Sequence, residues 1–132
     1  ACKLLRAPPI YNFAPSRATC HILKRGTSMK KVKITAVKMS RYDDLIEKYE
    51  NPIEHACDIT VGDTFIADGW NRPQGFCQSA WDSISPFVLA LASGGQDIYD
   101  GWMKNPKSAM ISCNDGFRPV SFYIEALEEE AD

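Results

Sequence analysis

From Ala109 to Ala126 the chain reads AMISCNDGFRPVSFYIEA, which is the clearest structural pattern in the sequence. Its second half alternates apolar side chains with other residues, and the apolar positions are Val120, Phe122, Ile124 and Ala126. This alternation is the period of a half-buried strand. The turn residues Asn-Asp-Gly at 114–116 separate it from a shorter apolar run. The stretch therefore predicts an antiparallel hairpin over residues 109–126.

Weaker patterns precede the hairpin. Alternation over residues 32–36 predicts a first strand, Ser40 is expected to cap a short helix ending near Tyr49, and residues 59–61 and 64–67 are strand-like. A helical apolar face predicts a long helix over 78–93, kinked or broken at Pro86, and residues 97–104 are typical of another short helix. We expect one small α+β domain with a mainly antiparallel sheet. Its predicted core is Val32, Ile34, Leu45, Trp81, Ile84, Val88, Leu91, Phe122 and Ile124.

Charge divides the 132 residues into two unequal parts. Residues 1–28 contain five basic residues and no acidic ones, whereas residues 29–132 contain ten basic and seventeen acidic residues. The second part opens with Met29-Lys-Lys-Val-Lys-Ile34, which is typical of a bacterial start followed by a basic strand. We therefore interpret residues 1–28 as a basic extension, either foreign to the domain or a genuine basic arm, and residues 29–132 as the domain.

Composition excludes several classes of function. No run approaches the roughly 18 apolar residues of a membrane helix, and the first residues lack the apolar segment of a secretory signal. The acidic body argues against a nucleic-acid partner. Five cysteines, an odd number without a disulfide framework, favour a reducing, cytoplasmic setting.

Three cysteines stand where secondary-structure elements are expected to begin or end. Cys57 precedes a strand, Cys77 opens the long helix, and Cys113 closes a strand. Thiolate ligands, with imidazole from His55, suit zinc or iron. A helix N-terminus also lowers the pKa of a thiol, which makes Cys77 a candidate nucleophile. The alternative is a structural role, in which each cysteine is a small buried apolar side chain.

Other side chains are weaker candidates. Arg118 could hold an anionic substrate, although a salt bridge to Asp115 or Asp82 is the commoner role for such a residue. Asp115 is interpreted first as a turn residue and second as a carboxylate ligand. Trp70 and Trp102, both in loops, are candidate ligand contacts or covers for the core.

From Met29 onward the chain resembles a family of small, uncharacterised bacterial proteins that is frequent in anaerobes. The resemblance rests on Gly75-Phe-Cys-Gln-Ser-Ala-Trp81 and on Cys113-Asn-Asp-Gly-Phe-Arg-Pro-Val120, with further matches at residues 29–34 and 57–65. The family pattern has cysteine at the positions of Cys57, Cys77 and Cys113. The resemblance implies no particular activity, but it implies that the three cysteines work together.

We therefore expect a cysteine-centred site that binds a metal or a small anionic ligand, or that acts through a reactive thiol. Cys77 and Arg118 are its candidate catalytic residues. The site is expected where Cys57, Cys77 and Cys113 converge near Arg118. Whether the protein is an enzyme stays open at this point. The alternative is a homo-oligomeric interaction or accessory module whose cysteines are structural.

Overall fold

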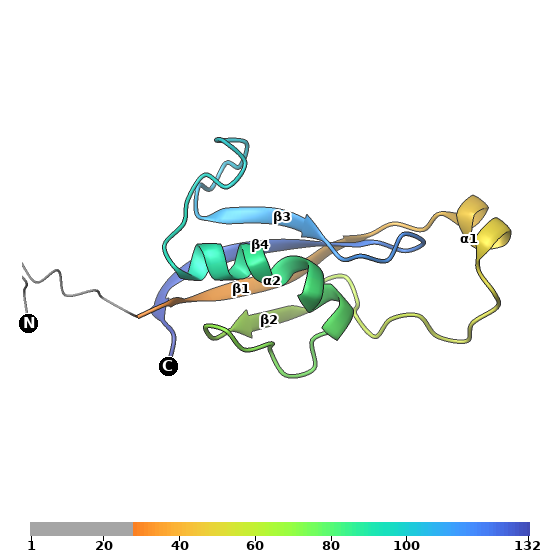
Figure 1. The fold of residues 1–132 in the computed structure, drawn as a ribbon, viewed down its shortest axis with the longest axis horizontal. Helices are drawn as coiled ribbons and strands as arrows, with labels where there is room; N and C mark the ends of the chain where they lie inside the picture. The colour runs from red at the N-terminus through yellow and green to blue at the C-terminus, as the bar shows by residue number, and fades with distance from the viewer. Residues whose placement is uncertain (1–27) are drawn as a thin grey trace, which may run out of the picture.

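A computed structural model describes residues 28–132, so the prediction for the basic extension falls outside the described residues. The elements follow in the order β1 (Lys30–Met39), α1 (Asp43–Tyr49), β2 (Thr64–Ala67), α2 (Gln78–Ala92), β3 (Ser108–Ser112) and β4 (Val120–Glu130) (Figure 1). The four strands form one antiparallel sheet in the order β2-β1-β4-β3. This is the α+β domain that the sequence predicts.

The hairpin at the end of the chain is confirmed. β3 pairs with β4 so that Met110 lies opposite Tyr123 and Ile111 opposite Phe122. β4 also pairs along the length of β1, with Ile34 opposite Ile124. The long alternating run after the turn is therefore a central strand, buried on one face by its apolar side chains.

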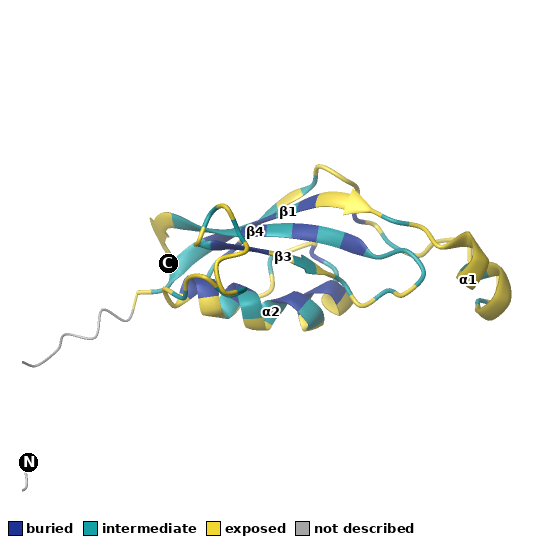
Figure 2. Ribbon diagram, turned by 90° about the horizontal axis from the view of Figure 1, so that it is seen from above, coloured by how far each residue is buried: buried dark blue, intermediate teal, exposed yellow. Residues whose placement is uncertain are grey.

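Helix α2 covers one face of the sheet (Figure 2). It is a single helix that contains Pro86 without ending there. Proline cannot donate a backbone hydrogen bond, but Pro86 and Asp82, four residues earlier, are both exposed, so water can bond the unpaired carbonyl. The buried core lies between α2 and the sheet and contains eight of the nine predicted residues, namely Val32, Ile34, Trp81, Ile84, Val88, Leu91, Phe122 and Ile124.

Four expectations for the chain between the main elements are wrong. Leu45 is 36% exposed, because α1 projects away from the sheet and has no buried residue (Figure 2). Ser40 does not cap α1. The N-cap residue is Tyr42, and its side chain makes no capping hydrogen bond. Residues 97–104 are turns, since Asp97 and Asp100 both have φ of 53°, which no α-helix allows. Residues 59–61 also lie outside the strands.

No helix within the described residues is both long and apolar enough to cross a membrane.

Candidate functional site

Cys57, Cys77 and Cys113 line one cavity of about 260 Å³. They come from three separate segments, since Cys57 lies in the connection between α1 and β2, Cys77 is the N-cap of α2, and Cys113 follows β3. All three side chains are partly buried rather than fully enclosed. Cysteines that only fill a core are among the most buried of residues, so this placement at a cavity wall is unusual for that role. The other polar residues that line the cavity are Ser79, Asn114, Asp115 and Arg118.

Two of the three sulfurs accept backbone hydrogen bonds, and the third stands at a helix N-terminus. The backbone N–H of Ile59 donates to Cys57 Sγ at 3.4 Å, and that of Val120 donates to Cys113 Sγ at 3.2 Å. Cys77 stands at the N-terminus of α2, where the helix dipole favours negative charge, and its side chain makes no capping hydrogen bond. N–H donors and a helix N-terminus both stabilise an ionised thiol relative to a neutral one.

Arg118 also lines the cavity, but its guanidinium is already engaged. Nη2 pairs with the carboxylate of Glu50, and Nη1 lies 3.4 Å from Asp115 Oδ2. Asp115 Oδ1 in turn accepts hydrogen bonds from the backbone N–H groups of Phe117 and Arg118, at 2.8 and 3.1 Å. Asp115 therefore shapes its turn and holds Arg118 at the same time. With two carboxylates on one guanidinium, little positive charge is left for an anionic ligand.

The thiol of Cys57 is the one whose titration is clearly altered. Burial raises the pKa of Cys57, and the N–H of Ile59 acts in the opposite direction. Negative charge on Cys77, Cys113 and Asp58 raises this pKa further. Cys77 and Cys113 are thus close enough to Cys57 for their charge to affect its pKa.

We expect the alkylation of Cys57 in the metal-free protein to require a higher pH than that of an ordinary thiol, whose pKa is about 8.5. A raised pKa keeps the thiol protonated as pH increases, so the rate should reach half its maximum above that value. The measurement is the rate of iodoacetamide modification between pH 6 and pH 10, with Cys57 identified by peptide mass spectrometry. A midpoint at or below about 8.5 would contradict the prediction.

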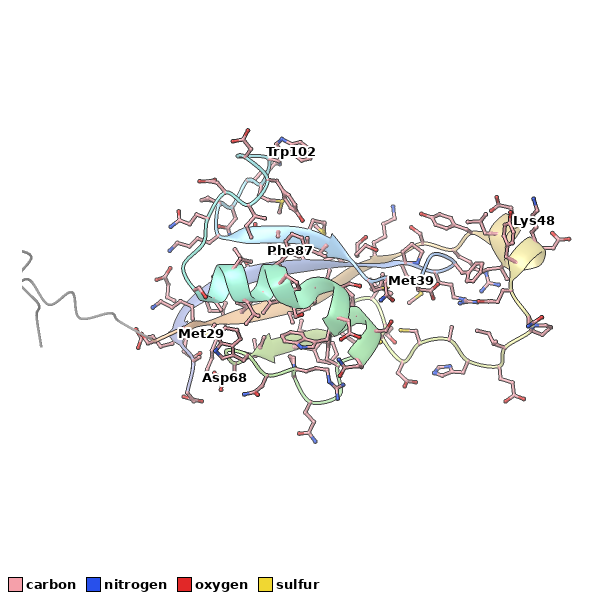
Figure 3. The ribbon with its side chains drawn as sticks, viewed as in Figure 1. Met29, Met39, Lys48, Asp68, Phe87 and Trp102 are labelled. Atoms are coloured by element: carbon pink, nitrogen blue, oxygen red, sulfur yellow. The ribbon has the colours of Figure 1, made fainter. Side chains whose placement is uncertain are left out.

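Three of the candidate residues lie away from the cysteine cavity. His55 Nε2 is 2.5 Å from Asp58 Oδ1, and it lines a neighbouring open groove of about 550 Å³ that shares only Ala56, Cys57 and Arg118 with the cavity. Trp70 and Trp102 are 70% and 83% exposed and line neither space. Figure 3 places Trp102 at the far end of the loop before β3.

Several residues of the site were not expected from the sequence. Ser79 Oγ donates to Asn114 Oδ1 at 2.6 Å and so ties the first turn of α2 to the connection between β3 and β4. The carboxylate of Glu50, 68 positions earlier in the sequence, forms an ion pair with Arg118. The turn motif at 114–116 could have indicated Asn114, because asparagine often bonds from such turns. No pattern near Glu50 points to its partner.

Among residues 28–132, no three His, Cys, Asp and Glu side chains form a group that could hold a metal ion as they stand. The three thiols therefore surround a space rather than a single point. No protein-family model, curated protein or solved structure matches the chain. The resemblance to the bacterial family accordingly stays an expectation, and the cavity itself is the basis for any functional argument.

Proposed function

We propose that the protein binds a soft metal centre in this cavity, with Cys57, Cys77 and Cys113 as its protein ligands. One observation carries the proposal, namely that three thiols from three distant segments line the same space. Thiolates are the preferred protein ligands of zinc and of iron–sulfur clusters. The cavity adjoins the core, because all three cysteines pack against the core cluster and Phe122 lines both.

The charges of the cavity favour a cation over an anion. Among residues 28–132, Arg118 is the only Lys or Arg that lines it, and two carboxylates already pair with that side chain. Burial is the main cause of the raised pKa of Cys57, and negative charge on Cys77 and Cys113 raises it further. A bound metal cation offsets this negative charge, so metal binding and thiol deprotonation favour each other.

The size of the cavity bears on the kind of metal centre. Zinc in a structural site is held by four ligands about 2.0–2.3 Å from a single ion, so zinc would require the three thiols to move together. A centre of several atoms, such as an iron–sulfur cluster, occupies more space between its ligands. The separated thiols and the volume of about 260 Å³ support a cluster more than a lone zinc ion. Three protein ligands would leave one position for water or substrate.

A second candidate is a reactive thiol at Cys77. The observation that favours it is the position of Cys77 at the N-terminus of a fifteen-residue helix, facing a cavity and making no capping bond with its side chain. Such a thiol is activated without a metal. Either chemistry needs reduced cysteines, and Cys57, Cys77 and Cys113 are not joined by disulfides, which supports a reducing, cytoplasmic setting.

The test is elemental analysis and optical spectroscopy of the full chain purified without oxygen, followed by thiol titration with and without a chelator. We expect bound iron with acid-labile sulfide, or zinc, and thiols that react only after the metal is removed. No metal, no uptake of zinc or of iron with sulfide, and one fast thiol at Cys77 would favour the second candidate. Three slow thiols and no metal uptake would overturn both proposals and return the cysteines to a structural role.

A further inference from the structure

Residues 41–56, called the arm below, project from the end of the sheet (Figure 1). The root of the arm is fixed, because the N–H groups of Ser40 and Tyr42 donate to the carbonyls of Pro119 and Phe117. Beyond the root, the structure buries nothing of α1, and Tyr42, Leu45, Tyr49 and Ile53 are 36–66% exposed. A seven-residue helix is marginal in water by itself, so a surface that covers the apolar side chains of the arm would stabilise it.

The sheet face opposite α2 is the second uncovered surface. Residues paired across an antiparallel sheet point to the same face, so Lys33 shares a face with its partners Ile66 and Glu125. Ser121 and Tyr123 of β4 point to the same face as Glu125. Their pairing partners, Lys38 and Met110, therefore lie on that face too. Within the described residues, no helix packs on this face, whereas α2 packs on the other one (Figure 2). Ile66 and Met110 are each 45% exposed there.

The two surfaces differ in net charge, because the open face carries Lys33 and Lys38 against Glu125, whereas acids outnumber bases on the arm. The arm holds five acidic residues against Arg41 and Lys48. Three of these acids, Asp44, Glu47 and Glu54, make no ion pair with any described residue. Lys33 and Lys38 on the open face likewise have no carboxylate within ion-pair distance among residues 28–132. Figure 3 shows Lys48 on the arm, beyond Met39 at the end of β1.

We propose that two copies of the protein form a symmetric dimer in which the acidic arm of each copy lies across the basic, open sheet face of the other. One chain carries both surfaces, so a two-fold axis makes the same contact twice. Tyr49, Leu45 and Ile53 supply apolar area to Ile66 and Met110 of the second copy. A nucleic acid is the other ligand that a lysine-bearing sheet could attract, but the acidic arm beside this face would repel it.

The dimer is independent of what the cysteine cavity binds, so its test does not depend on the metal. The mass of the full chain is measured by analytical ultracentrifugation at micromolar concentrations, in low and in high salt. We expect a dimer that weakens as salt increases, because screening reduces attraction between exposed charges. A monomer at every concentration and salt would overturn the proposal.

Charge reversals test the surfaces themselves. K33E with K38E, or E47K with E54K, should raise the dimer dissociation constant at least about tenfold, because each places like charges across the contact. All four substitutions in one chain should restore much of the affinity. The matched control is K104E, which reverses an exposed lysine in the loop before β3.

These positions are exposed or half-buried on the surface, and circular dichroism will show whether each variant folds. A dimer that responds equally to K104E and to the K33E/K38E pair would contradict the assignment of its surfaces. So would a monomeric chain that binds a single-stranded oligonucleotide through Lys33 and Lys38.

Discussion

We expect Phe122→Ala to lower the free energy of unfolding by about 3–5 kcal/mol, the usual cost of truncating a buried aromatic side chain. Phe122 lies near the start of β4, is fully buried, and packs its ring 5.3 Å from that of Phe76, centroid to centroid. Single domains of this size have a total stability of about 5–15 kcal/mol, so the variant should lose a large part of it. Chemical denaturation followed by circular dichroism measures the difference.

The matched control for Phe122→Ala is Trp102→Ala. Trp102 is 83% exposed, and its ring lies 6.1 Å from that of Tyr99, centroid to centroid. Exposed side chains usually change stability by about 0.5 kcal/mol or less when they are truncated. If the two substitutions cost the same, the core is not the one described between α2 and the sheet. Phe122 also lines the cysteine cavity, so its loss should loosen that site as well.

The second large effect concerns the cavity. If the three thiols hold a metal, Cys77→Ser should weaken metal affinity by more than about 100-fold. Removing residues that only support a ligand already costs about 10–100-fold, and loss of a ligand exceeds this. Cobalt(II) is a convenient probe, because its sulfur-to-metal charge-transfer absorption reports each coordinated thiolate. Titration of the anaerobic protein and of Cys57→Ser, Cys77→Ser and Cys113→Ser gives the four affinities.

Ser112→Ala provides the control for this titration. Ser112 is next to Cys113 and exposed, its hydroxyl bonds only the carbonyl of Cys113, and it does not line the cavity. The Ser112→Ala variant should bind cobalt(II) with the same affinity as the unchanged protein. Equal affinities for Cys77→Ser and Ser112→Ala would show that Cys77 is not a ligand. Loss of binding in only one cysteine variant would indicate a site built differently from the one proposed.

Much of the fold could be predicted from local patterns, because the spacing of apolar residues in the central strand and in α2 follows the face that each element buries. The alternation in β4 and the helical spacing of Ile84, Val88 and Leu91 both reflect a single buried face. The same reasoning is wrong for Leu45. Its helical spacing correctly indicates α1, but spacing cannot tell whether a helix packs on its own sheet or projects away from it.

Which residues line the cavity could be predicted only in part from the sequence. Cys77 and Cys113 adjoin the ends of elements, as expected, whereas Cys57 lies inside a long connection, and only the tertiary fold brings all three to one cavity. His55 is two positions from Cys57 and nevertheless lines a different space. The Glu50–Arg118 pair depends on how α1 ends and how the β3–β4 connection turns, which no local pattern encodes.

The pairing of β1 with β4 has a consequence for how the chain acquires its structure. These two central strands come from opposite ends of the described residues, and Lys30 lies opposite Glu130. During synthesis, everything from β1 to α2 emerges from the ribosome before the strand that β1 and α2 must pack against. Contacts so distant in sequence slow folding, because a long loop must close before they form. Until translation reaches β4, the edge of β1 that pairs with β4 is open, and an unpaired strand edge favours aggregation.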